Sequence, residues 1–238
     1  MQLQQKKYIK ASPYDWPHDG PISTEDTALV LVDMQNDFCA PGGYMDHQGY
    51  DISHIRSIIP GLQKLLGSCR EGGYQVYHTR EGHRPDLSTL SSRELFRSRN
   101  NASGLGIGDQ GPLGRLLIRG EKGHNTIPEL YPLSPDEWHQ SEPTIDKPGK
   151  GLFSTTDFAL LLSNRGIRRL ILAGVTTDVC VHTIMREAND RGMECLIVSD
   201  GCAAANDELH RVALESVKAE GGVFGAVARL EDVLAALH

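Results

Sequence analysis

Residues 27–33 read TALVLVD, a short run rich in β-branched residues that stops at a carboxylate. An apolar run without polar alternation predicts a strand buried on both faces, as in a parallel sheet. Three further runs have the same character: Gln75–His78, Arg169–Ala173 and Glu194–Val198. Stretches with helical spacing alternate with them, at Ile52–Cys69, Asp178–Arg191 and Asp207–Glu220. The alternation predicts an α/β fold of three layers, α/β/α, with a mostly parallel sheet.

The bulk composition excludes several classes of protein. A chain of 238 residues fits one domain, residues 1–238, better than two small ones. A formal net charge of -7 and a pI of about 5.8 argue against binding to nucleic acid. There is no run of about 18 apolar residues, and the N-terminal stretch lacks the apolar region of a secretory signal. We expect a cytoplasmic protein with no nucleic-acid or membrane partner.

The cysteine count is odd, with 5 residues scattered along the chain. This usage predicts free thiols rather than a disulfide framework. No Cys-x-x-Cys pair occurs, so a structural zinc knuckle is not expected.

A loop-rich insertion from about 82 to 143 interrupts the alternation. It is rich in Gly, Pro and Arg, and only short candidate elements such as Gly114–Ile118 lie within it. Long irregular segments in compact domains are usually functional or involved in assembly. We predict that the insertion walls the active site and contacts neighbouring subunits.

Two stretches of this insertion resemble binding motifs only superficially. Arg93 and Arg97 flank Glu94, which favours a solvated or substrate-facing loop over a nucleic-acid patch. The glycines of Gly104–Gly111 have no strand before them, so they indicate a flexible loop rather than a dinucleotide site.

Polar side chains gather at the predicted strand ends, where ligands bind in open α/β sheets. Asp33 ends the first run, and His78–Glu81 follow the second. Lys147 ends the short run TIDK, and Gly174–Cys180 follow the next strand. The sequence therefore predicts a site built from residues far apart along the chain.

Cys180 lies where a predicted strand turns into a helix. The free N–H groups of a first helical turn lower the pKa of a thiol and can bind an oxyanion. A buried structural cysteine is the alternative. Asp33 is a candidate base, and its alternative role is that of a turn former. Lys147 is a candidate fixed cation beside Asp33 and Cys180, and its alternative is a solvated surface lysine.

Three motifs carry a resemblance to a known family. The stretches LVDMQNDF (31–38), DKPGKGLFSTTD (146–157) and LAGVTTDVCVHTIMREANDRG (172–192) are similar to the isochorismatase-like cysteine hydrolases. The resemblance extends over about residues 28–224. It implies the isochorismatase-like hydrolase fold, a catalytic triad of Asp33, Lys147 and Cys180, no cofactor, and a homotetramer.

The resemblance also implies an oxyanion hole. In the family the peptide before the position of Thr176 is cis, which here is Val175–Thr176. That geometry directs the backbone N–H groups of Thr176 and Cys180 toward one point.

Stretches outside the triad resemble the biuret hydrolase branch, whose members cleave linear ureides such as biuret and triuret. They are PYDWP (13–17), GGYMDHQGYD (42–51), HTREGHRPDL (78–87), GEKGHNTIPELYP (120–132) and EGGVFGAV (220–227). This implies a small-molecule ureide as the substrate.

Three residues are candidate substrate contacts. Phe38 is predicted to pack against a planar substrate, and the alternative is an ordinary core residue. Lys150 is predicted to contact substrate carbonyls, and the alternative is a solvated lysine. Glu220 stands where the biuret hydrolase branch carries Gln. A carboxylate there accepts a hydrogen bond from the extra N–H of a longer ureide, which favours triuret over biuret; the alternative is an exposed glutamate with no role.

Other functions stay open at this point. Nicotinamidases also resemble the chain, but their metal site is formed by an Asp-x-His motif and further histidines. This chain has Glu81-Gly82-His83 in that region, and no histidine occupies the next expected ligand position. We therefore expect no metal. Within enzymes, the alternatives are a ureidoacrylate or an N-carbamoyl amino compound as substrate. A non-catalytic binding protein on the same fold is the alternative from another class, and a covalent adduct on Cys180 during turnover would exclude it.

Overall fold

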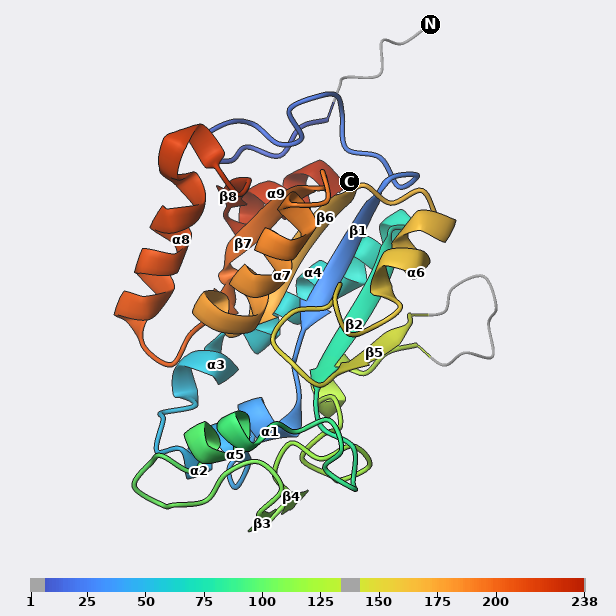
Figure 1. Ribbon diagram of the computed structural model, residues 1–238. Coiled ribbons are helices and arrows are strands. Elements are labelled where there is room, and N and C mark those ends of the chain that lie inside the picture. Colours follow the sequence, from blue (N-terminus) through green and yellow to red (C-terminus); the bar gives the residue numbers. More distant parts are fainter. Residues whose placement is uncertain (1–6, 134–141, 238) are drawn as a thin grey trace, which may run out of the picture.

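The computed structural model describes residues 7–133 and 142–237, and its centre is a six-stranded sheet (Figure 1). The strand order is β5-β2-β1-β6-β7-β8, and every neighbouring pair is parallel. The strands are β1 (Thr27–Val32), β2 (Gln75–Glu81), β5 (Thr144–Lys147), β6 (Arg169–Val175), β7 (Glu194–Ala203) and β8 (Ala226–Ala228). The predicted fold class is confirmed.

Helices cover both faces of this sheet (Figure 1). α4 (Ile59–Gly72) and α9 (Leu230–Leu237) pack on one face, and α6 (Phe158–Asn164), α7 (His182–Asn189) and α8 (Asp207–Gly222) pack on the other. All six side chains of β1 are buried, because alternate residues face the two helical layers: Leu29 and Leu31 join one core, Val30 and Val32 the other. This two-sided burial explains why the strand is apolar without alternation.

Two predicted helices are broken in the structure. The stretch 52–69 forms α3 (Ser53–Ser57) and then α4, whose second residue is Pro60. Proline lacks the N–H that a continuous helix needs, but it fits a first turn. The stretch 178–191 starts as one turn of π-helix, η2 (Thr177–Val181), and continues as α7.

Much of the insertion lies at the carboxyl end of the sheet, where Figure 1 shows α5 (Ser92–Ser98) and the small hairpin of β3 (Gln110–Gly111) and β4 (Gly114–Arg115). Backbone N–H of Leu117 donates to the Asp37 carboxylate at 3.0 Å, and the Gln35 side chain donates to the carbonyl of His124 at 3.1 Å. The insertion is thus tied to the segment that directly follows β1. Its contact with neighbouring subunits stays a prediction, and residues 134–141 lie outside the described part.

The remaining short elements are α1 (Asn36–Cys39), α2 (Tyr44–His47) and η1 (Pro128–Leu130). Among the described residues, no helix has the length and apolar character needed to cross a membrane.

A buried ion pair joins α4, β2 and the chain just before β5. Both oxygens of Glu142 accept from the Arg70 guanidinium, at 2.7 and 2.8 Å, and Oε2 lies 3.0 Å from Nε2 of His78. Burial raises the pKa of Glu142, but the bonds from Arg70 and His78 outweigh it and lower the pKa to about 2.

Replacing Glu142 by Gln should therefore destabilise the fold by about 2–3 kcal/mol at pH 7, measured by urea unfolding, since it leaves the buried side of Arg70 without its charge partner. Because the carboxyl pKa is lower in the folded chain, wild type should hold its advantage above about pH 4.5 and lose it as the pH falls toward 2.

The matched control is Glu129→Gln, which removes a largely exposed pair with Arg56 at 3.5 Å. It should change the free energy of unfolding by less than about 0.5 kcal/mol. Equal effects from the two variants would contradict the role given to Glu142.

Candidate active site

Four chemically active side chains meet at the carboxyl ends of neighbouring strands. Asp33 follows β1, Glu81 ends β2, Lys147 ends β5, and Cys180 lies in η2 after β6. All four are buried, with exposed fractions of 0 to 4%. The strand order explains why these residues lie together. β2 pairs with one edge of β1 and β6 with the other, so the direction in which successive strands are added reverses at β1. Ligand sites of open α/β sheets lie at such a reversal, beyond the carboxyl ends of the strands.

Lys147 lies among three acidic or thiol groups. Its Nζ is 2.8 Å from Oδ2 of Asp33, 3.5 Å from Sγ of Cys180 and 3.6 Å from Oε2 of Glu81. It also donates to the carbonyl of Gly149 at 2.9 Å. Burial lowers the pKa of Lys147, but the anions beside it, Asp33 first, outweigh burial and raise the pKa above its ordinary value. The lysine is therefore a permanent cation.

Asp33 is held in place by Thr79 of β2. The Thr79 hydroxyl donates to Oδ1 at 2.6 Å, and the backbone N–H of Asp33 lies 3.1 Å from the same hydroxyl oxygen. Asp33 has a φ of 50°, in the left-handed region, a conformation that costs about 1–3 kcal/mol for a residue other than glycine. Both carboxylate oxygens thus have a partner, Thr79 for one and Lys147 for the other.

Glu81 is the fourth member of this cluster, and the sequence assigned it no catalytic role. Its Oε2 lies 3.3 Å from Sγ of Cys180, and its Oε1 pairs with Nζ of Lys150 at 2.5 Å. The Gln35 side chain fixes its backbone by accepting from the N–H at 2.6 Å and donating to the carbonyl at 3.0 Å. Glu81 shares with Asp33 its place at the carboxyl end of a strand, but β2 reads QVYHTRE and lacks the apolar run that singled out Asp33.

The electrostatics of Cys180 differ from the sequence expectation. Burial raises the pKa of the thiol well above its ordinary value, Asp33 and Glu81 raise it further, and Lys147 and Lys150 only oppose this. The sequence predicted a lowered thiol pKa at a helix N-terminus, but burial, together with the Asp33 and Glu81 carboxylates, acts in the opposite direction. A base must therefore take the thiol proton before the sulfur can attack.

The backbone before Cys180 has the expected geometry. The Val175–Thr176 peptide is cis, as the family resemblance implies. The carbonyl of Thr176 accepts from the N–H groups of Val179 and Val181 at 3.2 and 3.1 Å. The assignment of the Thr176 and Cys180 N–H groups to an oxyanion hole stays a prediction.

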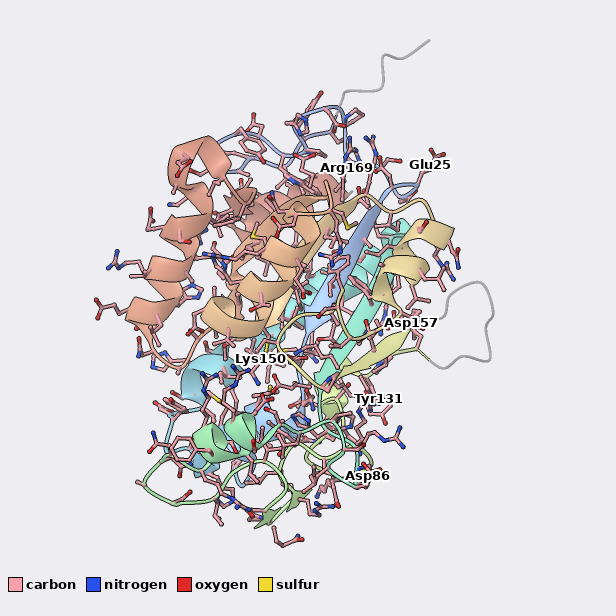
Figure 2. All side chains as sticks on the ribbon, viewed as in Figure 1. Glu25, Asp86, Tyr131, Lys150, Asp157 and Arg169 are labelled. Carbon is pink, nitrogen blue, oxygen red and sulfur yellow. The ribbon has the colours of Figure 1, made fainter. Side chains whose placement is uncertain are left out.

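A cavity of about 400 Å³ lies beside Lys150. Figure 2 shows Lys150 at the carboxyl end of the sheet. Lys150 bridges from Glu81 to Glu94 of α5, at 2.5 and 2.9 Å, and so separates the buried cluster from this cavity. The lining residues are Tyr44, Arg93, Glu94, Arg97, Ser98, Ile107, Gly149 and Lys150. The insertion thus supplies part of the lining of this cavity, through Arg93, Glu94, Arg97, Ser98 and Ile107; its role as a wall of the active site stays a prediction.

The three predicted substrate contacts have different surroundings. Lys150 and Tyr44 line the cavity, whereas Phe38 is buried, with its ring centroid 6.4 Å from that of Tyr44. Glu220 is exposed near the end of α8, with a φ of 53°, and lies at the opposite end of that helix from the cluster (Figure 1). Within one chain it does not reach Cys180. All three roles stay predictions.

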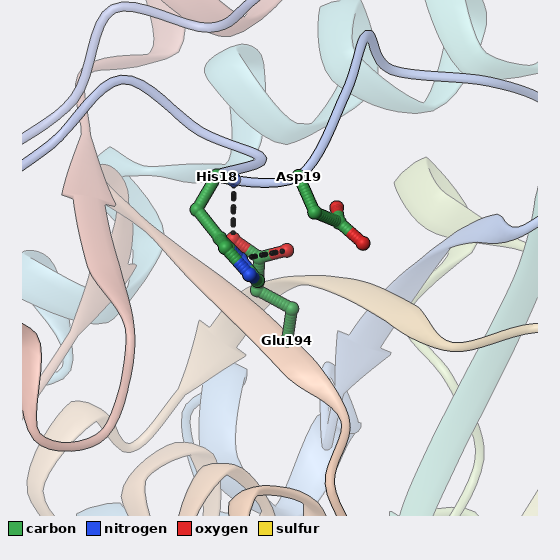
Figure 3. A group of neighbouring side chains, drawn as sticks. All are labelled: His18, Asp19 and Glu194. Atoms are coloured by element: carbon green, nitrogen blue, oxygen red, sulfur yellow. Dashed lines mark hydrogen bonds and ion pairs between the residues drawn. The ribbon is translucent and has the colours of Figure 1, made fainter.

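Two groups of side chains in the described part of the chain have the spacing of metal ligands. His18, Asp19 and Glu194 meet at the amino end of the sheet (Figure 3), but the Asp19 carboxylate is paired with Arg168 and Arg169. The donor atoms of Asp33, Glu81 and Cys180 lie within 4.8 Å of one another, and the Lys147 ammonium already lies among them. A metal there would face this cation at close range.

Comparison with known proteins agrees with this geometry. The family profile "Isochorismatase domain" matches residues 27–232. The chain is 30% identical over 209 residues to a protein of Acinetobacter baylyi named ureidoacrylate amidohydrolase RutB, covering 83% of this chain and 79% of that one. A protein of the same name from Azorhizobium caulinodans is 27% identical, with 91% and 92% covered.

Solved structures are similar in fold. A cysteine hydrolase from Pseudomonas syringae has a TM-score of 0.75 at 24% identity, with 99% of this chain and 98% of that one covered. The N-carbamoylsarcosine amidase of Thermoplasma acidophilum has a TM-score of 0.63 at 21% identity, with 87% and 97% covered.

The position of Lys147 gives a prediction about metals. Prolonged dialysis against a strong chelator should leave both the thermal midpoint and the alkylation rate of Cys180 unchanged, because Lys147 supplies the positive charge that these donors need. Calorimetry and timed iodoacetamide labelling measure the two quantities. A drop in either that is restored by Zn²⁺ alone would show that a metal belongs to the site.

Proposed function

The chain belongs to the isochorismatase domain family, and from that premise we propose that it is a cysteine-dependent amidohydrolase of small linear ureides. The observation that carries the proposal is the contact of the Cys180 thiol with both a lysine ammonium and a carboxylate in a buried cluster. A nucleophile, a proton acceptor and a fixed cation are the parts that acyl transfer through a thioester needs. The named relatives support amide hydrolysis as the reaction.

The proposed reaction is a double displacement. A buried carboxylate takes the thiol proton, and the Cys180 sulfur attacks the carbonyl carbon of the ureide. The oxyanion is bound by the backbone N–H groups of Thr176 and Cys180. The carboxylic acid then gives its proton to the departing nitrogen, and water hydrolyses the thioester. The sequence resemblance assigns the carboxylate role to Asp33, and Lys147 stabilises the thiolate.

Two substrate classes, which differ in charge, fit this reaction. The named relatives favour ureidoacrylate, a ureido acid. Arg93 and Arg97 line the cavity beside Lys150 and offer cations for a carboxylate, although Glu94 opposes them. The stretches that resemble biuret hydrolases favour the neutral ureides biuret and triuret. All these compounds share the H₂N–CO–NH group, which is the unit that we propose is cleaved.

The nucleophile is tested by Cys180→Ser. The variant should lose at least about 10³-fold in kcat for any ureide that wild type hydrolyses, because an alkoxide is far harder to form than a thiolate. Cys202→Ser is the matched control: this cysteine is also buried, but its sulfur faces the Leu172 carbonyl at 3.8 Å. The Cys202 variant should retain activity within a few-fold, and mass spectrometry should detect a covalent adduct on Cys180 of wild type. Full activity in Cys180→Ser would overturn the assignment.

The substrate class is tested by nitrogen release from ureidoacrylate, biuret, triuret and nicotinamide. We expect turnover of at least one ureide and none of nicotinamide. If the substrate is the ureido acid, the double change Arg93→Gln/Arg97→Gln should lower its kcat/KM by about 10–100-fold, since charge-assisted bonds are lost. If the substrate is neutral, the same change should leave kcat/KM within about threefold.

Arg84→Gln is the control for this series, because Arg84 is exposed and pairs only weakly with Asp86 at 3.6 Å. It should affect neither class of substrate. Failure of every ureide to release nitrogen would reject the proposed function.

A further inference from the structure

The Thr79 hydroxyl contacts both the side chain and the main chain of Asp33. It donates its proton to Oδ1 at 2.6 Å, and its oxygen accepts from the Asp33 N–H at 3.1 Å. The same N–H lies 3.2 Å from the Thr79 carbonyl. Thr79 is buried in β2, whereas Asp33 directly follows β1. One hydroxyl of the neighbouring strand thus ties the direction of the Asp33 carboxylate to the path of its own backbone.

This tie is needed because an aspartate does not fix the direction of its own carboxylate. The χ2 torsion of aspartate is broad and roughly two-fold, so either oxygen can face a given neighbour. The β-branched side chain of Thr79 is stiff at χ1, and the strand holds its backbone. The left-handed φ of 50° at Asp33 also persists only where the surroundings hold it, and the Thr79 contacts are of that kind.

The two oxygens of Asp33 are therefore not equivalent. Oδ1 accepts the Thr79 proton, whereas Oδ2 faces the ammonium of Lys147 at 2.8 Å. The same ammonium lies 3.5 Å from Sγ of Cys180. A proton that binds Oδ2 leaves the Thr79 bond intact, because Oδ1 still accepts it. A proton that binds Oδ1 must first displace the Thr79 proton, so the arrangement favours Oδ2 as the acceptor.

The Cys180 thiol requires an acceptor of fixed direction. In the resting cluster the thiol donates to Glu81 over 3.3 Å, so the S–H bond must rotate about Cβ–Sγ before its proton can pass to Asp33. An oxygen of Asp33 lies within 4.8 Å of Sγ. Because a hydrogen bond weakens steeply away from linear geometry, a rotating donor is productive only if the acceptor already points toward it.

We propose that Thr79 is a positioning residue that makes Oδ2 of Asp33 the atom that receives the thiol proton. The S–H bond of Cys180 breaks with its electron pair left on sulfur, an O–H bond forms on Oδ2, and Lys147 lies beside the new thiolate. The hydroxyl acts through direction and not through basicity, since a hydrogen bond to a carboxylate favours the ionised form and makes it a weaker base. The inference rests on the proposed function, in which Asp33 is the base.

The experiment compares Thr79→Val, which keeps the β-branched shape and loses the hydroxyl, with Thr79→Ser, which keeps the hydroxyl. Thr79→Val should lower kcat for any ureide that wild type hydrolyses by about 10–100-fold, with KM within about threefold, because a hydrogen bond to a charged group is lost. Iodoacetamide labelling of Cys180 at pH 7, which needs no substrate, should slow at least about fivefold in the same variant. Thr79→Ser should recover both rates.

Thr27→Val is the matched control. Thr27 is also a buried threonine, and its hydroxyl donates to the Asp26 carboxylate at 3.1 Å, but it lies at the amino end of β1. Each valine variant loses one hydrogen bond from a buried threonine, so calorimetry should give similar drops in the thermal midpoint. Only Thr79→Val should lower kcat and the labelling rate, which separates an effect on the site from a general loss of stability.

The inference is wrong if Thr79→Val keeps the two rates of wild type, or exceeds them as a stronger base would. It is equally wrong if Thr79→Ser is as impaired as Thr79→Val. If Thr79→Val does not fold, Thr79→Ala takes its place under the same expectations. Wild type that releases nitrogen from no ureide would reject the proposed function, whereas the labelling rates would still decide the role of Thr79.

Discussion

The buried ammonium of Lys147 is the constraint on which the rest of the structure depends. A lysine with no exposed surface is tolerated only beside anions, and here these are Asp33, which follows β1, and Glu81, which ends β2. The Cys180 thiol, from the turn after β6, lies beside them. The ends of four separate chain segments must therefore coincide within a few ångströms. The parallel sheet brings these ends together, because strands that are not consecutive in sequence are neighbours in it and their carboxyl ends share one edge.

Exclusion of water has two opposite effects on this cluster. The insertion covers the carboxyl end of the sheet through its bonds to Gln35 and Asp37, and this burial strengthens every interaction with Lys147. The same burial raises the pKa of the Cys180 thiol. Under the proposed function, the thiol proton must therefore pass to a neighbouring group inside the cluster rather than to bulk water.

The sequence predicted the strands and the grouping of Asp33, Lys147 and Cys180, because strand ends in a parallel sheet share one edge. It placed Glu81 at the same edge but assigned it no role, and it expected the strand to end at His78, three residues before its observed end. The distance of Glu220 from the cluster was not predicted, for a geometric reason. A helix that follows a parallel strand runs back toward the amino edge, so Glu220, 13 residues beyond Asp207 near the end of α8, lies roughly 20 Å from the start of that helix.

The pairing of two carboxylates with two lysines links the buried cluster to the neighbouring cavity. Lys147 is sealed inside the cluster, whereas the side chain of Lys150 is 39% exposed and lines the cavity. Glu81 contacts both Lys150 and the sulfur of Cys180, so one carboxylate connects a side chain at the cavity with the buried thiol. Under the proposed function, a substrate carbonyl that binds Lys150 would therefore change the charge beside the thiol through this single side chain.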